Sequence, residues 1–328
     1  RGHDDRPWCL TVSFTHPHDP YVARQRFWDL YQDCAHLEPA VAAIPFAEQD
    51  RHSQRLMLAC DYTKFEITPE DVRRSRRAYF ANISYLDEKI GGILGVLERG
   101  RMADNTIVLF VSDHGDMLGE RGMWFKMSFF EGSSRVPLMI AAPGLEPCRV
   151  DAPVSTVDVT PTLADLAGVS LDEIMPWTDG ESLLALANGG RRDTPVAIEY
   201  AAEGSHAPLV SLRYGKWKYN RCLLDPEQLF DLDADPNELR NLAGDAAQRE
   251  TLETLRDQAG GRWDLDAYDA EVRQSQARRR VVYEALRNGA YYPWDFQPLQ
   301  KASERYMRNH MDLNVLEENQ RFPRGGGR

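Results

Sequence analysis

The sequence lacks any apolar run long enough to cross a bilayer, and it lacks an excess of basic residues. A membrane helix needs about 20 consecutive apolar residues, and none of that length occurs among the 328 residues. The 39 Lys and Arg against 51 Asp and Glu give a formal net charge of −12, so the overall field repels polyphosphates. We therefore expect neither a membrane partner nor a nucleic-acid partner.

Cysteine is also scarce, and no secretory leader opens the chain. The cysteines form no C-x-x-C pair and show no spacing typical of a metal site. An odd number of them, without a leader, favours a reducing compartment, and we expect a cytoplasmic protein. The five are Cys9, Cys34, Cys60, Cys148 and Cys222.

The apolar residues that are present suffice for a large core, at 42% of the chain. Residues 8–14 (WCLTVSF) predict a buried strand that ends in a polar loop containing two prolines. Thr68 predicts a helix N-cap, followed by Pro69 at the first helical position and by acidic residues in the first turn. Apolar residues then recur at helical spacing up to Gly100, so we expect one long helix there.

Strands and helices alternate further along the chain. The apolar runs 106–111 and 136–142 are typical of parallel strands buried on both faces, and a short helix begins at Thr160. This alternation predicts an α/β fold. Short alternating segments beyond residue 190 predict a small antiparallel subdomain, and a charged helix from about Trp263 begins a tail without a core of its own. The segments are 197–200, 210–214, 216–219 and 229–232.

Three polar clusters follow predicted strands, where α/β enzymes place their active sites. They are His16 with His18, Asp113 with His114, and the segment around Lys126. An adjacent Asp and His can both bind a cation, and a lysine among aromatic residues can bind an anion. The alternatives are that Asp113 only caps a turn, that the histidines are exposed loop residues, and that Lys126 extends into solvent.

The order and spacing of several motifs resemble the sulfatase family of the alkaline-phosphatase superfamily. They are SFTHPHDP (13–20), FVSDHGD (110–116) with Gly119 and Lys126, EGSSRVPL (131–138), LRYGKWKY (212–219) and LFDL (229–232). Within that family, segments 113–126 and 309–319 resemble the choline-sulfatase group in particular. The resemblance implies an incomplete central mixed sheet flanked by helices, a small antiparallel C-terminal subdomain and an extended tail. The implied boundaries are 1–190, 191–262 and 263–328.

The resemblance also implies roles for individual residues. Asp113 and His114 would bind a divalent metal, most simply Ca²⁺, with Mg²⁺ or Mn²⁺ as alternatives. Lys126 would hold a sulfate oxygen, and His18 would contact the sulfate and protonate the leaving alcohol. Glu203 would face a trimethylammonium group, its alternative being a solvated loop acid. The implied enzyme is a sulfuric ester hydrolase that converts choline O-sulfate to choline and sulfate.

One element that the resemblance requires is missing from this sequence. Sulfatases attack with a formylglycine made from the Cys of a C-x-P/A-x-R motif, and none of the five cysteines stands in one. We expect that motif upstream of Arg1, and we expect the 328 residues alone to be inactive. The alternatives are a phosphonate monoester or phosphodiester hydrolase of the same superfamily and a non-catalytic sulfatase-like binding protein. The tail implies a homo-oligomer.

Overall fold

The computed structural model describes residues 7–171 and 175–287. Contacts within the chain divide it into two compact units. Unit 1 comprises Arg1–Glu38, Ile67–Asp104 and Gln300–Arg328, and unit 2 comprises Pro39–Glu66 and Asn105–Leu299. Four of the five predicted site residues belong to unit 2, and His18 belongs to unit 1.

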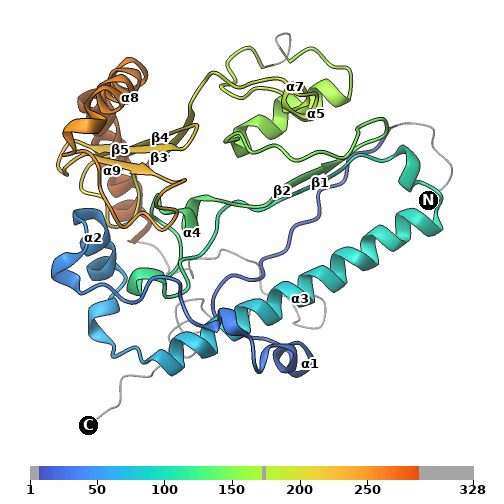
Figure 1. Ribbon diagram of the computed structural model, residues 1–328, viewed down its shortest axis with the longest axis horizontal. Coiled ribbons are helices and arrows are strands. Elements are labelled where there is room, and N and C mark those ends of the chain that lie inside the picture. Colours follow the sequence, from blue (N-terminus) through green and yellow to red (C-terminus); the bar gives the residue numbers. More distant parts are fainter. Residues whose placement is uncertain (1–6, 172–174, 288–328) are drawn as a thin grey trace. The chain divides into compact units, whose positions relative to one another are not determined.

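Unit 1 is built on the long helix that the sequence predicts, α3 (Pro69–Arg99). Its N-terminus carries a complete capping box, in which Thr68 and Asp71 satisfy each other's backbone N–H groups. The short helix α1 (Gln25–Trp28) packs against α3 (Figure 1). The connection is polar as well as apolar, since Arg77 donates to the carbonyl oxygen of Trp28 at 2.9 Å. The 3₁₀-helices of this unit are Asp29–Tyr31, Ala35–Leu37 and Ala103–Asn105.

The strand predicted over residues 8–14 is wrong. The segment has no regular structure, and Trp8, Leu10 and Val12 are exposed at 57%, 69% and 47%. An apolar segment becomes a strand only when a neighbouring strand accepts its backbone hydrogen bonds. No strand in the described part of the chain pairs with this one.

In unit 2, β1 (Val108–Val111) and β2 (Leu138–Ala141) occur where strands are predicted, but they run antiparallel. The predicted parallel arrangement is therefore wrong. Parallel neighbours need a crossover connection, whereas residues 112–137 hold only the 3₁₀-helix Glu120–Gly122 and the single turn α4 (Glu131–Ser134). The chain therefore leaves β1 and enters β2 at the same end of the strand pair. The predicted burial on both faces is also wrong, because Met139 is 59% exposed.

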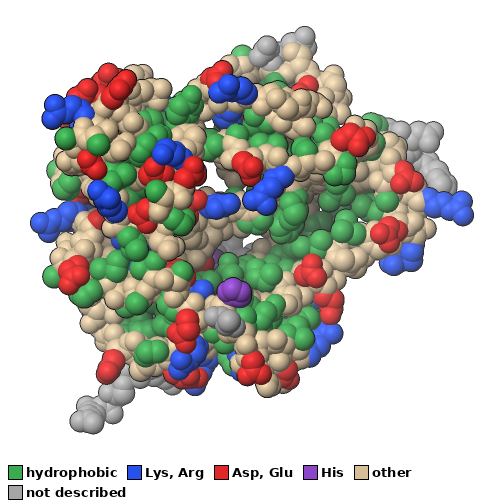
Figure 2. Space-filling model, in the orientation of Figure 1, with side chains coloured by type: hydrophobic (Ala, Val, Ile, Leu, Met, Phe, Trp, Pro, Cys, Tyr) green, Lys and Arg blue, Asp and Glu red, His purple; other side chains and the backbone are tan. Residues whose placement is uncertain are grey.

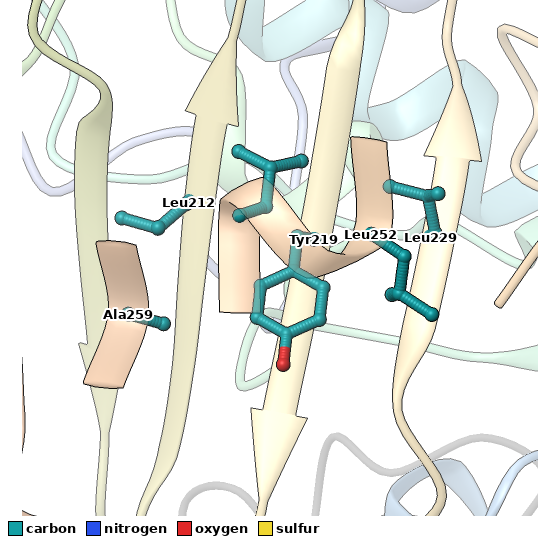
Figure 3. Packing of buried hydrophobic residues seen from close by; sticks show 6 residues of the cluster. Leu212, Tyr219, Leu229, Leu252 and Ala259 are labelled. Atoms are coloured by element: carbon teal, nitrogen blue, oxygen red, sulfur yellow. The ribbon is translucent and has the colours of Figure 1, made fainter. Parts of the chain in front are cut away.

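The antiparallel subdomain is confirmed. β3 (Val196–Tyr200), β4 (Leu209–Tyr214), β5 (Trp217–Cys222) and β6 (Gln228–Asp231) form a four-stranded sheet in chain order, with every neighbouring pair antiparallel. Helix α8 (Arg249–Arg262) packs across one face of this sheet. Figure 3 shows Leu252 and Ala259 of α8 against side chains of three strands, which are Leu212, Tyr219 and Leu229.

The remaining helices of unit 2 include α2 (Arg51–Ala59). The short helix predicted at Thr160 is confirmed as α5 (Val159–Leu166), and the charged helix predicted from Trp263 as α9 (Leu265–Arg287). The predicted tail beyond residue 287 lies outside the described residues. The others are α7 (Leu184–Ala187) and the 3₁₀-helices Phe46–Glu48, Tyr62–Lys64, Thr156–Asp158 and Ala246–Gln248.

On the face drawn in Figure 2, acidic and basic side chains are interspersed. No helix in the described ranges has the length and hydropathy needed to span a bilayer.

Candidate active site

Asp113 and His114 directly follow β1, and the structure brings their polar atoms together. Nε2 of His114 lies 3.6 Å from Oδ2 of Asp113. Nδ1 of His114 lies 2.8 Å from the carbonyl oxygen of Gly115. Because a carbonyl only accepts hydrogen bonds, Nδ1 carries a hydrogen, and Nε2 is the ring nitrogen that faces the carboxylate.

The Asp113 carboxylate and the His114 imidazole are two groups that can bind a divalent cation, through an oxygen and a nitrogen atom respectively. The Asp113 side chain is open to solvent at 84% exposure, whereas that of His114 is at 36%. Among the described residues, no group of three or more His, Cys, Asp and Glu side chains could hold a metal. Asp113 and His114 therefore offer two ligands of a site that needs others.

The carboxyl of Asp113 stays ionised through local hydrogen bonding. Partial desolvation raises its pKa. Two effects outweigh this: the backbone N–H of His114 donates to Oδ1 at 2.9 Å, and the imidazole of His114 lies nearby. The net pKa lies below the ordinary value for aspartate. Asp113 is therefore an anion at neutral pH, which is the form that a metal ligand requires.

Close backbone packing holds the turn that follows His114. The N–H of Gly115 donates to the carbonyl oxygen of Ser133 at 2.7 Å. A Cβ atom at Gly115 would lie 2.2 Å from the carbonyl oxygen of Gly132. Only glycine allows this approach, so the pair Gly115 and Gly132 fixes where the chain returns toward β2.

Replacing Gly115 with alanine is expected to destabilise the chain by about 1–3 kcal/mol, because a backbone atom rather than a flexible side chain must move. Urea unfolding of Gly115→Ala against the parent chain measures this loss. Gly244→Ala is the matched control, since nothing lies within 4 Å of a Cβ there. Equal unfolding free energies for the two variants would contradict the assigned close approach.

Lys126 lies on a loop with an unusual backbone. The residues on either side of it, Phe125 and Met127, have φ values of 64° and 77°. This left-handed conformation costs a non-glycine residue roughly 1–3 kcal/mol and persists only when surrounding contacts impose it. One such contact is internal: Oδ1 of Asp116 accepts the N–H groups of Leu118 at 2.9 Å and of Phe125 at 3.0 Å.

Two buried side chains from outside the loop provide further contacts. The Tyr62 hydroxyl donates to the carbonyl oxygen of Trp124 at 2.7 Å, and Nε2 of His52 donates to that of Met127 at 2.7 Å. Both donors come from the region of α2, and both are 8% exposed. Burial raises the pKa of Tyr62 and lowers the pKa of His52, so both are neutral donors at pH 7. The backbone on either side of Lys126 is therefore fixed by α2 and the turn after it.

Glu203 lies in the loop between β3 and β4 and is exposed. The Tyr200 hydroxyl lies 3.1 Å from its carboxylate and 2.9 Å from its carbonyl oxygen. This loop also reaches α2, because Nε of Arg55 donates to the carbonyl oxygen of Gly204 at 3.2 Å, and Arg55 is itself paired with Asp225. An aromatic ring beside a carboxyl group is a suitable host for an organic cation.

His18 lies in the loop at 15–20 of unit 1, where Nδ1 is 2.7 Å from the carbonyl oxygen of Asp19. Its side chain is 38% exposed. The structure thus joins Asp113 to His114 and ties the Lys126 and Glu203 loops to α2, all within unit 2. His18 belongs to the other unit, and the roles of all five residues stay predictions.

The sequence did not indicate His52, Tyr62 or Asp116 as part of the site. Residues 19–65 show no sustained periodicity, and the N-cap of α2, Asp50, is the only local signal there. An N-cap predicts where a helix begins. It does not predict that a side chain of this helix, His52, will contact Met127, 75 residues further along the chain.

Family models match nearly the whole chain. The model described as Sulfatase matches residues 1–169, which is more than half of the 328 residues. The model for the N-sulphoglucosamine sulphohydrolase C-terminal region matches residues 119–261. The model for the choline sulfatase enzyme C terminal matches residues 270–322.

Curated proteins that are similar in sequence to this chain are named as sulfatases. The choline-sulfatase of Rhizobium meliloti (strain 1021) is 68% identical over 331 residues, which cover 99% of this chain and 65% of that protein. Arylsulfatase K of Gallus gallus is 37% identical over 191 residues, covering 54% of this chain and 35% of that protein. The chain therefore spans less than two thirds of the length of these relatives.

Solved structures share the fold. The phosphonate monoester hydrolase of Agrobacterium radiobacter superposes with a TM-score of 0.65 at 25% identity, covering 79% of this chain and 57% of that one. A putative sulfatase from Bacteroides fragilis superposes with a TM-score of 0.62 at 26% identity, covering 77% and 53%. The expected mixed α/β architecture is thereby confirmed.

Proposed function

Because this chain belongs to the sulfatase family, we propose that the protein hydrolyses choline O-sulfate to choline and inorganic sulfate. The observation that carries the proposal is the 68% identity to a choline-sulfatase over 99% of the chain. The match of residues 270–322 to the choline sulfatase C-terminal model supports the same substrate independently of the Sulfatase match.

The proposed roles follow the chemistry of each side chain. Lys126 binds a sulfate oxygen and neutralises charge that develops on the ester, and its fixed loop means that little reorganisation is needed. His18 contacts the sulfate and gives a proton to the departing alcohol oxygen. Glu203 and the ring of Tyr200 face the trimethylammonium group, which has no hydrogen to donate and is held by charge and by the aromatic face.

Two groups complete the proposed site. Asp113 and His114 would hold a divalent cation, with calcium as our first choice and magnesium or manganese as alternatives, and such an ion neutralises negative charge on the sulfate ester. The nucleophile of the family is a formylglycine derived from the Cys of a C-x-P/A-x-R motif, which this sequence does not contain. We therefore expect the chain alone to be inactive.

The test compares this chain alone with a fusion in which the preceding segment of the Rhizobium choline-sulfatase is placed before Arg1. Sulfate release from choline O-sulfate is measured with calcium present and after chelation. We expect turnover by the fusion only, and loss of turnover on chelation. A fusion that cleaves a phenylphosphonate monoester faster than choline O-sulfate would favour the phosphonate hydrolase alternative, which the structural likeness to such an enzyme motivates.

Replacing Glu203 with glutamine in the fusion is expected to raise KM for choline O-sulfate about tenfold, which corresponds to about 1.4 kcal/mol of cation binding. The KM for 4-nitrophenyl sulfate, which carries no cation, should not change. Glu253→Gln removes the same charge from an exposed position on α8 and is the control. Equal KM changes for the two esters would count against a cation-binding role.

We also propose that the protein is cytoplasmic and that its domain boundaries lie near residues 190 and 262.

We further propose that segment 263–328 joins copies of the chain into a homo-oligomer. The expected consequence is a smaller assembly when residues after Tyr291 are deleted. Light scattering measures the mass, and an unchanged mass would contradict the role of the tail.

A further inference from the structure

One side chain of α2, His52, contacts both loops of the proposed site. Its Nε2 lies 2.7 Å from the carbonyl oxygen of Met127, the residue directly after Lys126. Its ring packs edge-on against Tyr200, with centroids 5.6 Å apart and an interplanar angle of 64°. Tyr200 in turn donates to Glu203. His52 thus lies between the proposed sulfate-binding and cation-binding residues.

The hydrogen bonding of His52 defines its tautomer. The Met127 carbonyl only accepts, so Nε2 carries the hydrogen. Nδ1 is buried and has no hydrogen-bond partner in the described ranges. Burial and the charge of Arg55 lower the pKa of His52, and they outweigh the Met127 hydrogen bond and the charges of Asp50 and Asp225, which raise it. His52 is therefore a neutral, single donor and not a proton-transfer group in this state.

The hydrogen bond from His52 supports the backbone conformation at Met127. Met127 is held at a φ of 77° although it is not glycine, and such a conformation needs external support. Tyr62 supports the other side of the loop through Trp124. If the donor at His52 is removed, the backbone after Lys126 can relax toward an ordinary conformation, and the ammonium group moves with it.

We propose that His52 is a positioning residue that fixes Lys126 and the Tyr200–Glu203 pair through two separate contacts, a hydrogen bond and a ring contact. It thereby couples recognition of the sulfate to recognition of the cation in one substrate. This inference rests on the proposed function for the identity of the two ligand groups.

Two substitutions separate the contacts. His52→Phe keeps a ring beside Tyr200 but has no donor, whereas His52→Gln places an amide donor near the Nε2 position but has no ring. In the fusion, we expect His52→Phe to lower kcat about 10–100-fold for both choline O-sulfate and 4-nitrophenyl sulfate, because misplacement of a reacting contact by about 1 Å has that scale of effect. His52→Gln should recover most of kcat while raising KM for the choline ester alone by about 2–10-fold.

Binding measurements provide a readout that does not depend on turnover. Calorimetric titration of the fusion with inorganic sulfate should show weaker binding in His52→Phe than in His52→Gln. Titration with choline should show the reverse order. Tyr62→Phe removes the other loop donor without touching Tyr200, so it should weaken sulfate binding and leave choline binding unchanged.

Failure of this inference differs from failure of the proposed function. Both His52 variants could weaken sulfate and choline binding equally, in proportion to their loss of thermal stability. That result would mean that His52 is only structural. A parent fusion that neither cleaves choline O-sulfate nor binds choline would overturn the proposed substrate and the coupling together. In that case the sulfate titrations would still decide whether His52 positions Lys126.

Discussion

Replacing Lys126 with alanine in the fusion is expected to lower kcat for choline O-sulfate about 10²–10³-fold, the usual loss when one preorganised group that stabilises developing charge is removed. The reason is local. Two left-handed residues and the buried donors His52 and Tyr62 hold the backbone at Lys126, so the proposed sulfate contact is preorganised. Steady-state kinetics with saturating ester measure the loss.

The conservative variant sharpens this prediction. Lys126→Arg keeps the charge but replaces a compact ammonium with a planar fork, so it should recover only part of kcat. Lys64→Ala is the matched control, because Lys64 follows α2 in an exposed ion pair with Asp61. If Lys126→Ala kept more than a third of the parental kcat, Lys126 would not be the sulfate ligand.

Replacing Lys218 with methionine is expected to destabilise the chain by about 3–5 kcal/mol, the usual cost of removing one partner from a buried ion pair. The Lys218 side chain is 1% exposed, and its Nζ lies 2.6 Å from Glu131 Oε1, 2.9 Å from Glu238 Oε1 and 2.6 Å from the carbonyl oxygen of Phe129. Burial already raises the pKa of Glu238. Without the ammonium group, Glu238 must be buried either as an unpaired charge or with a bound proton.

Urea unfolding of the chain at pH 7 measures this effect. Lys216→Met is the control, since that lysine is 42% exposed where it pairs with Asp231, and its loss should cost less than about 1 kcal/mol. The double variant Lys218→Met with Glu238→Gln should recover part of the stability, because the amide oxygen can still accept the N–H of Glu131. A double variant less stable than Lys218→Met would contradict the view that the unpaired carboxylate causes the loss.

Features set by neighbouring residues were predictable from the sequence. The capping box of Thr68 and Asp71 and the proline between them predict the start of α3, and the alternation in 210–219 predicts β4 and β5. In both cases the determining interactions join residues close in sequence. Asp113, His114, Lys126 and Glu203 could be selected because their residue types and motif resemblance are visible without the fold.

Features that depend on distant contacts were not predictable. Residues 8–14 have the composition of a strand but no described neighbour, and the direction of β2 depends on the path of the 26 residues between 111 and 138. The roles of His52 and Tyr62 arise from hydrogen bonds to backbone carbonyls that are 75 and 62 positions away. A carbonyl acceptor exists at every residue, so the sequence does not mark which one a buried donor meets.

The buried Lys218 also helps to hold the loop that carries Lys126. Its hydrogen bond to Phe129 ties the segment after Lys126 to β5, while His52 and Tyr62 tie the part around Lys126 to α2 and the turn after it. A loop anchored on both sides in this way cannot swing open without breaking buried polar contacts, each of which is costly to leave unmade. The loop that carries Lys126 is therefore preformed, so in the proposed function the ester would meet a rigid surface and not a closing lid.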